Sequence, residues 1–276
     1  NKDKAFDTFK KRIGNRKEIE KTSHHGFRLS MLWRYAAIIA VVLAVGCFSY
    51  WQGGVNVKDT FADISVEAPL GSRTKLYLPD GTLVWLNAGS RMTYSQGFGV
   101  DNRMIELEGE GYFEVRRNEK LPFFVKTKDL QLQVLGTKFN VEGYSDKDDF
   151  EVTLMEGSVR VASRIGLGDT LMLKPDSKAC LQKDGRLKVI PVDDYNPYRW
   201  KEGLICFRNE SFLSIMNDLE KYFGVSIVVE NKNVLKYYFT GKFRQADGID
   251  YALRVLQRDI RFKYERDDEN QIIYIR

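Results

Sequence analysis

The feature that most constrains this chain is an uncharged, apolar run between Tyr35 and Trp51. It reads YAAIIAVVLAVGCFSYW, and the sequence stays free of charge as far as Val57. A helix rises about 1.5 Å per residue, so roughly 20 residues cross a hydrocarbon layer about 30 Å thick. Aromatic residues, Trp33 among them, stand at both ends of the run, as is typical of membrane interfaces. The run therefore predicts a transmembrane helix over residues 34–53 rather than a buried core helix.

Basic charge is concentrated before this run. Residues 1–34 contain ten Lys or Arg residues and four Asp or Glu residues, whereas the whole 276-residue chain has a net charge of +5. Because positive flanks stay in the cytoplasm, we expect residues 1–33 to be cytoplasmic and residues 52–276 to lie across the membrane. The position of the charge argues against a direct nucleic-acid partner. The chain begins at Asn1 rather than Met, so we expect native residues to precede it.

Residues 60–190 have the sequence pattern of an all-β domain. Two β-prone runs, 73–78 and 82–87, flank a Pro-Asp-Gly turn, which is a hairpin signal because Pro presets φ and Gly accepts a left-handed conformation. Further short β-prone runs follow at intervals of roughly ten residues, and no helical pattern interrupts them. We expect a sandwich or a solenoid-like stack of short strands.

A polar, proline-bounded linker at residues 191–198 precedes a small α+β module at residues 199–276. The pattern there reads strand, helix, strand, strand, helix, strand, strand, which resembles two βαβ halves. Ser211 is the expected N-cap of the first helix and Gly224 its C-terminal stop. Asp247 is the expected cap of the second helix.

Motifs for enzyme chemistry are missing from the sequence. It contains no Gly-rich phosphate loop, no Cys/His cluster and no G-x-S-x-G motif. The only histidines, His24 and His25, are adjacent, and neighbouring residues do not share a helix face as metal ligands would. We therefore expect a non-enzymatic protein with no cofactor and no metal. Cys180 and Cys206 either form a disulfide or remain two free thiols, and the second interpretation is favoured.

One peptide bond, Gly136-Thr137, is a candidate for self-cleavage. A Thr hydroxyl can attack the preceding carbonyl when the backbone is strained, and Gly on the acyl side minimises crowding. The favoured interpretation is simpler: a bend between two strands in which Gly adopts a conformation barred to other residues.

Several ordered motifs resemble those of the FecR family, whose members are membrane regulators (anti-sigma factors) of extracytoplasmic-function (ECF) sigma factors. In the all-β region these motifs are Leu78-Pro-Asp-Gly81, Leu107-Glu-Gly-Glu-Gly-Tyr-Phe-Glu-Val115, Leu135-Gly-Thr-Lys-Phe-Asn-Val141 and Leu154-Met-Glu-Gly-Ser-Val159. The tail is similar to the C-terminal module of the Bacteroidetes branch, which itself resembles the signalling domain of TonB-dependent transducers. The matching segments there are Leu219-Glu-Lys-Tyr-Phe223 and Tyr238-Phe-Thr-Gly241.

The resemblance implies a single-pass protein of the inner membrane with a cytoplasmic N-terminus and periplasmic C-terminal domains. Its implied partners are a cytoplasmic ECF sigma factor and the signalling domain of an outer-membrane TonB-dependent transporter, with periplasmic or intramembrane proteases as further candidates. The family usually has a longer helical sigma-binding domain before the membrane, so residues 1–33 are expected to be a truncated part of it. Because some family members cleave themselves at the matching Gly-Thr, the resemblance also makes Gly136-Thr137 a candidate for self-cleavage.

The last predicted strand is the candidate partner-binding element of the module. We expect it to be an exposed edge that accepts a partner strand by β-augmentation, with main-chain hydrogen bonds providing affinity. The residues of this candidate site are Gln271, Ile272, Ile273, Tyr274 and Ile275.

Two alternatives of other classes remain open. Ala44-Val-Gly-Cys47 loosely fits a lipid-attachment box, which would make the chain a lipoprotein of the outer envelope. The all-β region could instead be a periplasmic carbohydrate-active domain with Glu108 and Glu110 as a carboxylate pair on one strand face, or a glycan-binding module.

Overall fold

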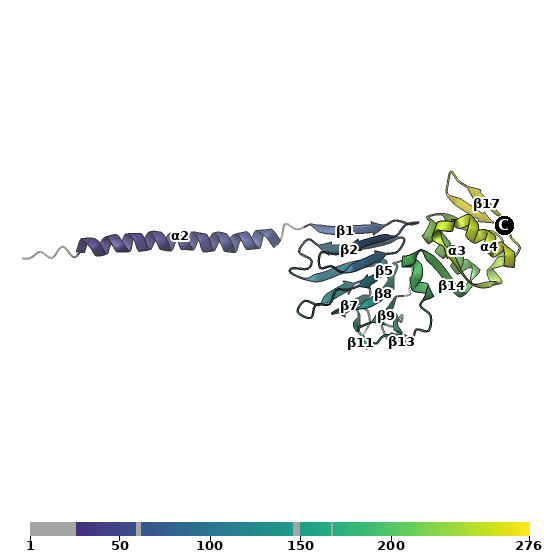
Figure 1. Cartoon of the computed structure of the whole chain (residues 1–276), viewed down its shortest axis with the longest axis horizontal. Helices are drawn as coiled ribbons and strands as arrows, with labels where there is room; N and C mark the ends of the chain where they lie inside the picture. Colours follow the sequence, from purple (N-terminus) through teal and green to yellow (C-terminus); the bar gives the residue numbers. More distant parts are fainter. Residues whose placement is uncertain (1–25, 59–61, 146–149, 167) are drawn as a thin grey trace, which may run out of the picture. The chain divides into compact units, whose positions relative to one another are not determined.

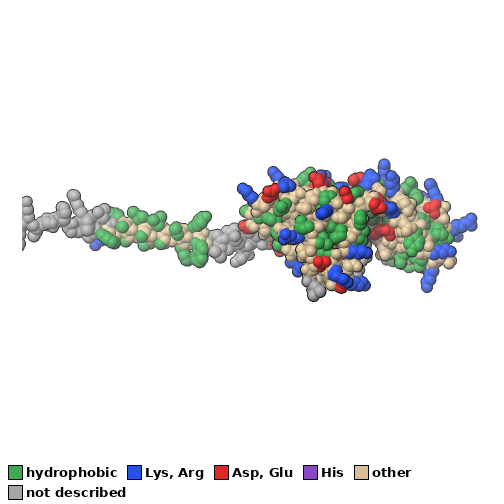
Figure 2. All heavy atoms as spheres, turned by 90° about the horizontal axis from the view of Figure 1, so that it is seen from below, with side chains coloured by type: hydrophobic (Ala, Val, Ile, Leu, Met, Phe, Trp, Pro, Cys, Tyr) green, Lys and Arg blue, Asp and Glu red, His purple; other side chains and the backbone are tan. Residues whose placement is uncertain are grey.

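The computed structural model describes residues 26–58, 62–145, 150–166 and 168–276 (Figure 1). The chain divides into two compact units, Asn1–Thr60 and Phe61–Arg276. The described part of the first unit is one helix, α2 (Gly26–Lys58). Its segment Trp33–Trp51 has a mean hydropathy of 1.6 and is long and apolar enough to cross a membrane. Figure 2 shows hydrophobic side chains along this segment, so the predicted apolar helix is confirmed.

The second unit begins with thirteen strands, which we call the β-rich part. They are β1 (Asp63–Ala68), β2 (Thr74–Tyr77), β3 (Leu83–Leu86), β4 (Ser90–Ser95), β5 (Arg103–Glu114), β6 (Phe123–Lys126), β7 (Leu130–Val134), β8 (Lys138–Gly143), β9 (Glu151–Glu156), β10 (Val159–Ser163), β11 (Thr170–Leu173), β12 (Ser177–Leu181) and β13 (Leu187–Pro191). The expected all-β region is confirmed, and its described residues contain no helix. The predicted hairpin is β2–β3, in which Gly81 adopts φ +84° at the turn.

The long strand β5 organises the β-rich part. Its first half pairs with β4 and β6, and its second half pairs with β3 and β8, so β5 belongs to two facing layers of one near-closed sheet. Gly109 lies between the halves with φ +95°. A Cβ atom there would lie 2.4 Å from the Ser90 Oγ, so this passage between layers requires glycine. Between the layers lies an apolar core in which the rings of Phe113 and Phe139 stack 5.1 Å apart.

The chain then forms a smaller unit of mixed structure, which we call the C-terminal module. Its elements are the 3-10 helix η1 (Asn196–Glu202), β14 (Leu204–Ser211), α3 (Phe212–Phe223), β15 (Ser226–Val229), η2 (Lys232–Lys236), β16 (Tyr238–Arg244), η3 (Gln245–Asp247), α4 (Ile249–Asp259), β17 (Tyr264–Asp267) and β18 (Ile272–Ile275). The predicted caps of α3 are confirmed: the Ser211 hydroxyl accepts from the Ser214 amide, and Gly224 adopts φ +65°. The predicted cap of the second helix is wrong. Gly248, with φ +81°, precedes α4, and Asp247 belongs to η3.

The module contains two small sheets. β14 pairs with β16, and β18 lies between β15 and β17. Because β18 pairs in parallel with β15 and antiparallel with β17, its backbone is hydrogen-bonded on both sides. The prediction that Gln271–Ile275 forms an exposed edge is therefore wrong: the edge strands of this sheet are β15 and β17.

Candidate functional site

The C-terminal module packs directly on the β-rich part, and we call this contact the junction. Tyr112 of β5 belongs to the same buried apolar cluster as Trp200, Phe212 and the other core residues of the module. Trp85 of β3 packs against that cluster as well. The apolar core of the module is therefore completed by side chains of the β-rich part.

A buried carboxyl group, that of Glu110, lies at the centre of the junction. Glu110 is 5% exposed. One of its oxygens accepts a hydrogen bond of 2.6 Å from the Asn87 side-chain amide, and the other accepts one of 3.1 Å from Asn140. From the module, Lys221 of α3 places its Nζ 4.0 Å from the carboxyl group, and the Tyr222 hydroxyl lies 3.4 Å from the Asn87 amide nitrogen. Residues from both parts of the chain thus surround one acid.

Burial determines the protonation behaviour of this acid. Loss of hydration raises the pKa of Glu110 to about 7, and the charge of Glu142 raises it further, whereas Lys221 and the two Asn amides lower it. The Oδ1 atom of Asn140 is buried without a hydrogen-bond partner. A protonated Glu110 can donate to that oxygen only after rotation of the Asn140 amide, which gives up the present bond from the Asn140 NH2 group, so the amide bonds favour the ion and burial favours the neutral acid. Burial likewise holds the pKa of Tyr222 well above its usual range.

Hydrogen bonds to the loop before β2 fasten the junction along one side. The amide of Gly71 donates to the Lys221 carbonyl at 2.9 Å. The side-chain amide of Gln245 donates both to the Gly71 carbonyl at 3.1 Å and to the Tyr222 carbonyl at 2.5 Å. The Arg73 guanidinium donates to the Trp200 carbonyl. These bonds and the shared core join the β-rich part and the module into one body.

Cavities border the junction. One of about 610 Å³ is lined by Leu70, Lys221 and neighbouring side chains, and another of about 520 Å³ is lined by Arg73, Trp85 and Lys201 among others. Such volumes fall in the range of small-ligand sites. The junction therefore offers accessible space beside its buried cluster.

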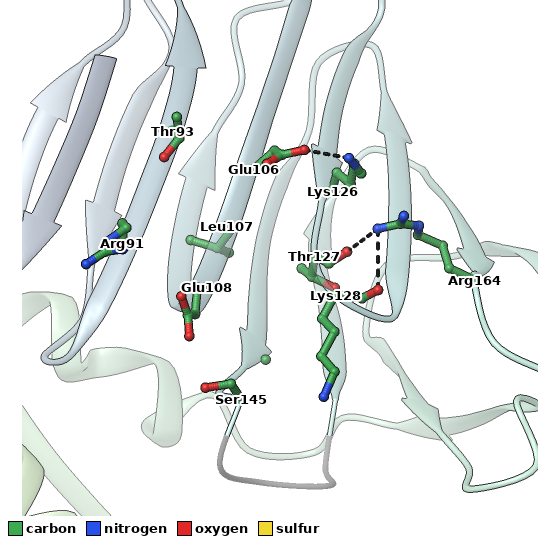
Figure 3. Close-up of a pocket in the computed structure, with 11 residues that line it drawn as sticks. Arg91, Thr93, Glu106, Leu107, Glu108, Lys126, Thr127, Lys128, Ser145 and Arg164 are labelled. Carbon is green, nitrogen blue, oxygen red and sulfur yellow. Dashed lines mark hydrogen bonds and ion pairs between the residues drawn. The ribbon is translucent and has the colours of Figure 1, made fainter. Parts of the chain in front are cut away.

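A separate groove of about 440 Å³ lies in the β-rich part between β4, β5 and the end of β6 (Figure 3). Its charges largely satisfy one another: Lys126 pairs with Glu106 at 2.5 Å, and Arg164 donates to the carbonyl oxygens of Thr127 and Lys128. This mixture of paired charges favours no single ligand class.

The predicted cleavage bond lies between β7 and β8. Thr137 is 4% exposed, and its hydroxyl donates to the Ser158 carbonyl at 3.0 Å. A Cβ atom at Gly136 would approach the Arg117 Cα to 2.7 Å, which explains the glycine by close packing. Self-cleavage of Gly136-Thr137 stays an untested hypothesis, and the uncleaved bond stays the favoured interpretation.

The structure separates the two carboxylates that the sequence suggests as a pair. Glu108 is exposed and lines the groove of Figure 3, whereas Glu110 is buried in the junction. Gly109, at which β5 passes between the layers, lies between them. They therefore do not face one cleft as a hydrolytic pair would.

The thiols are free in the structure. Cys47 is exposed on α2, and Cys180 and Cys206 are half-buried. Cys180 donates to Glu151 at 3.3 Å, and burial raises the pKa of its thiol to about 11. His24 and His25 lie outside the described residues.

The sequence singled out Glu110, but as half of a hydrolytic pair, and it did not single out the side chains that surround Glu110 in the junction. Asn87 follows β3, Asn140 lies on β8, and Lys221 and Tyr222 both lie on α3, so these residues come from three segments that meet only in the folded chain. One feature of the sequence pointed to the junction. Asn87 directly follows the apolar run Leu83–Leu86, and a polar residue at the end of an apolar strand needs a hydrogen-bond partner where it is buried.

Comparison with known proteins places these features in a family. The family model described as "FecR protein" matches residues 64–160, and the model described as "FecR, C-terminal" matches residues 204–275, so together they match more than half of the chain. No curated protein matches the sequence.

Two crystal structures of a "putative anti-sigma factor" from Parabacteroides distasonis ATCC 8503 are similar to this chain. One is 28% identical with a TM-score of 0.66, covering 77% of this chain and 98% of that chain. The other is 27% identical with a TM-score of 0.66, covering 78% and 98%. The chain therefore belongs to the FecR family, with a FecR domain in its β-rich part and a FecR C-terminal domain formed by its module.

Proposed function

We propose that this protein is an inner-membrane anti-sigma factor that relays a signal across the membrane. In this proposal α2 spans the membrane once, the basic N-terminal side binds a cytoplasmic ECF sigma factor, and residues 62–276 lie in the periplasm. The family, the apolar segment Trp33–Trp51 and the excess of basic residues before it support this topology.

The periplasmic input in this proposal is the signalling domain of an outer-membrane TonB-dependent transporter, which binds the C-terminal module. A partner can shift the state of the protein only if it binds one state more tightly than another. The observation that carries the relay is the junction, because its shared core and hydrogen bonds couple the module to the β-rich part. In this proposal, a change in the module on partner binding therefore alters contacts of the β-rich part, because within the described residues no flexible linker separates the two.

For the transporter contact we propose the free edge of β17. Lys263 and Arg276 exchange both of their backbone hydrogen bonds. Backbone groups alternate in direction along an antiparallel strand, so the backbone N–H of Glu265 points toward β18 and that of Arg266 points away from the sheet. The opposite edge strand, β15, is already partly covered, because the Ile227 amide donates to the Glu220 side chain. An incoming strand can pair with the outward amides of β17.

Purification of the tagged full-length protein from its native membrane, followed by mass spectrometry of bound proteins, tests the function. We expect both an ECF sigma factor and a TonB-dependent transporter. Absence of both partners would refute the proposal that this protein is a sigma-factor regulator.

A backbone substitution tests the edge separately. Arg266→Pro removes an outward amide while leaving the bonds to β18, and Arg266→Ala is the matched control that keeps the amide. We expect the transporter to be lost with Arg266→Pro and retained with Arg266→Ala. Equal recovery with both variants would exclude the β17 edge.

A further inference from the structure

The 520 Å³ cavity at the junction differs in charge from the groove of Figure 3. Arg73 reaches it from the loop before β2, Lys75 from β2 and Trp85 from β3. From the module, Lys201 of η1 and Gln245 of η3 complete the lining. Its lining contains three cationic side chains and no carboxylate. We call it the cationic pocket, and both the β-rich part and the module contribute to it.

Aromatic rings hold two of these cations in place. Lys75 lies directly opposite Trp85 in the β2–β3 ladder, with its Nζ 5.2 Å from the centre of the indole ring. The Nζ of Lys201 lies 3.5 Å from the centre of the Tyr112 ring and 5.6 Å from that of Trp85. Contacts with ring faces orient the ammonium groups but supply no full negative charge.

Nearby carboxylates are engaged elsewhere or lie farther away. Glu202 pairs with Arg199 at 3.0 Å, and within the described residues neither Lys75 nor Lys201 has a carboxylate within 4.0 Å. Glu114 and Glu202 act on Lys201 only through longer-range charge, and burial is the larger effect, which lowers the pKa of Lys201. Burial also lowers the pKa of Arg73. Arg73 and Lys201 are therefore partly dehydrated cations, and the exposed Lys75 lies beside them.

We propose that the cationic pocket binds a small ligand carrying two or more oxyanion groups, and that this ligand fastens the module to the β-rich part. Guanidinium and ammonium groups from separate elements suit several oxyanions at once, because each contributes charge-assisted hydrogen bonds. The cavity volume fits a small molecule. Phosphate-based and carboxylate-based polyanions share this chemistry. The proposal goes beyond the regulatory function and does not depend on the identity of its protein partners.

Calorimetric titration of the full chain in detergent tests this proposal. The probes are inorganic tripolyphosphate and tricarballylate, each at constant ionic strength, with hexaglutamate representing an acidic protein segment. The test variant is Lys75→Met/Lys201→Met, which keeps the apolar stems on the rings. Lys128→Met is the control, because Lys128 is an exposed lysine of the groove in Figure 3.

We expect saturable one-to-one binding of at least one small probe, with affinity at least tenfold weaker in the double variant and unchanged in Lys128→Met. The probe that binds more tightly identifies the phosphate or the carboxylate class. Lack of saturable binding, equal loss in Lys128→Met, or tighter binding of hexaglutamate than of both small probes would overturn the proposal. If the double variant fails to fold, Lys75→Met alone, at an exposed position, is expected to weaken binding at least threefold.

Discussion

Replacement of the buried acid Glu110 by its neutral isostere, Glu110→Gln, tests the account of the junction most directly. In the folded protein the pKa of Glu110 rises from 4.5 to about 7, mainly through burial. The folded state therefore binds more protons than the unfolded state between these two values. The contribution of Glu110 to the stability of the folded protein is fully present below pH 4.5 and is lost as the pH rises through 7.

The expected size of this effect follows from the shift. Each pKa unit corresponds to 1.36 kcal/mol, so ionisation of Glu110 reduces the free energy of unfolding by ~3 kcal/mol between pH 4.5 and pH 8. Gln does not ionise, and after rotation of the Asn140 amide the Gln amide can donate to the Asn140 Oδ1 in exchange for the present bond from the Asn140 NH2 group. We expect Glu110→Gln to match the wild type near pH 5 and to be more stable by ~2–3 kcal/mol at pH 8.

Urea unfolding of the fragment 62–276 measures the effect. This fragment contains both apolar clusters, and the fluorescence of Trp85 and Trp200 reports on the junction. The difference between variant and wild type at each pH isolates Glu110 from the other acids. Glu108→Gln is the matched control, since Glu108 is exposed on the same strand, and its difference curve should be flat.

This reasoning is refuted if the free energies of unfolding of Glu110→Gln and of the wild type fall by the same amount between pH 5 and pH 8. Glu110 would then be ionised throughout that range, with Lys221 and the Asn amides outweighing burial.

Three further predictions concern stability and processing. Trp200→Ala, at a side chain 1% exposed in the module core, should lower the free energy of unfolding by ~3–5 kcal/mol in urea titrations. Gly109→Ala should cost at least ~2 kcal/mol through its positive φ and its contact with Ser90, whereas the control Gly241→Ala, with open space around its Cβ, should change stability by less than ~1 kcal/mol. We expect the wild-type chain to run as one band in denaturing electrophoresis, because the Thr137 hydroxyl is directed to a carbonyl oxygen. Fragments of 136 and 140 residues in the wild type but not in Thr137→Val would instead establish self-cleavage.

Local features of the fold were predictable from the sequence because neighbouring residues produce them. The cap at Ser211 and the stop at Gly224 depend on one turn of backbone. The second helix shows where such reasoning fails. Asp247 has the right chemistry for a cap, but η3 includes Asp247 and moves the start of α4 to follow Gly248.

The position of β18 could not be read from its residues. Alternation of side chains predicts a strand at Gln271–Ile275 but does not identify its neighbours, since backbone hydrogen bonds are the same for every residue type. Pairing with β15, a strand some 45 residues earlier in the chain, makes β18 central. The edges of this sheet are therefore β15 and β17, and the partner contact that we propose lies at β17.

The sequence by itself determined the apolar helix, the all-β region, the α+β module and the resemblance to FecR regulators, because hydrophobic periodicity, turn residues and short motifs are properties of contiguous residues. Only the tertiary structure decided which charges meet. Glu110 became a buried acid of raised pKa, and Lys75 and Lys201 became neighbours in one pocket, because packing of the module on the β-rich part removes water from some side chains and leaves others exposed. Desolvation depends on the surroundings in three dimensions, and a linear sequence does not contain them.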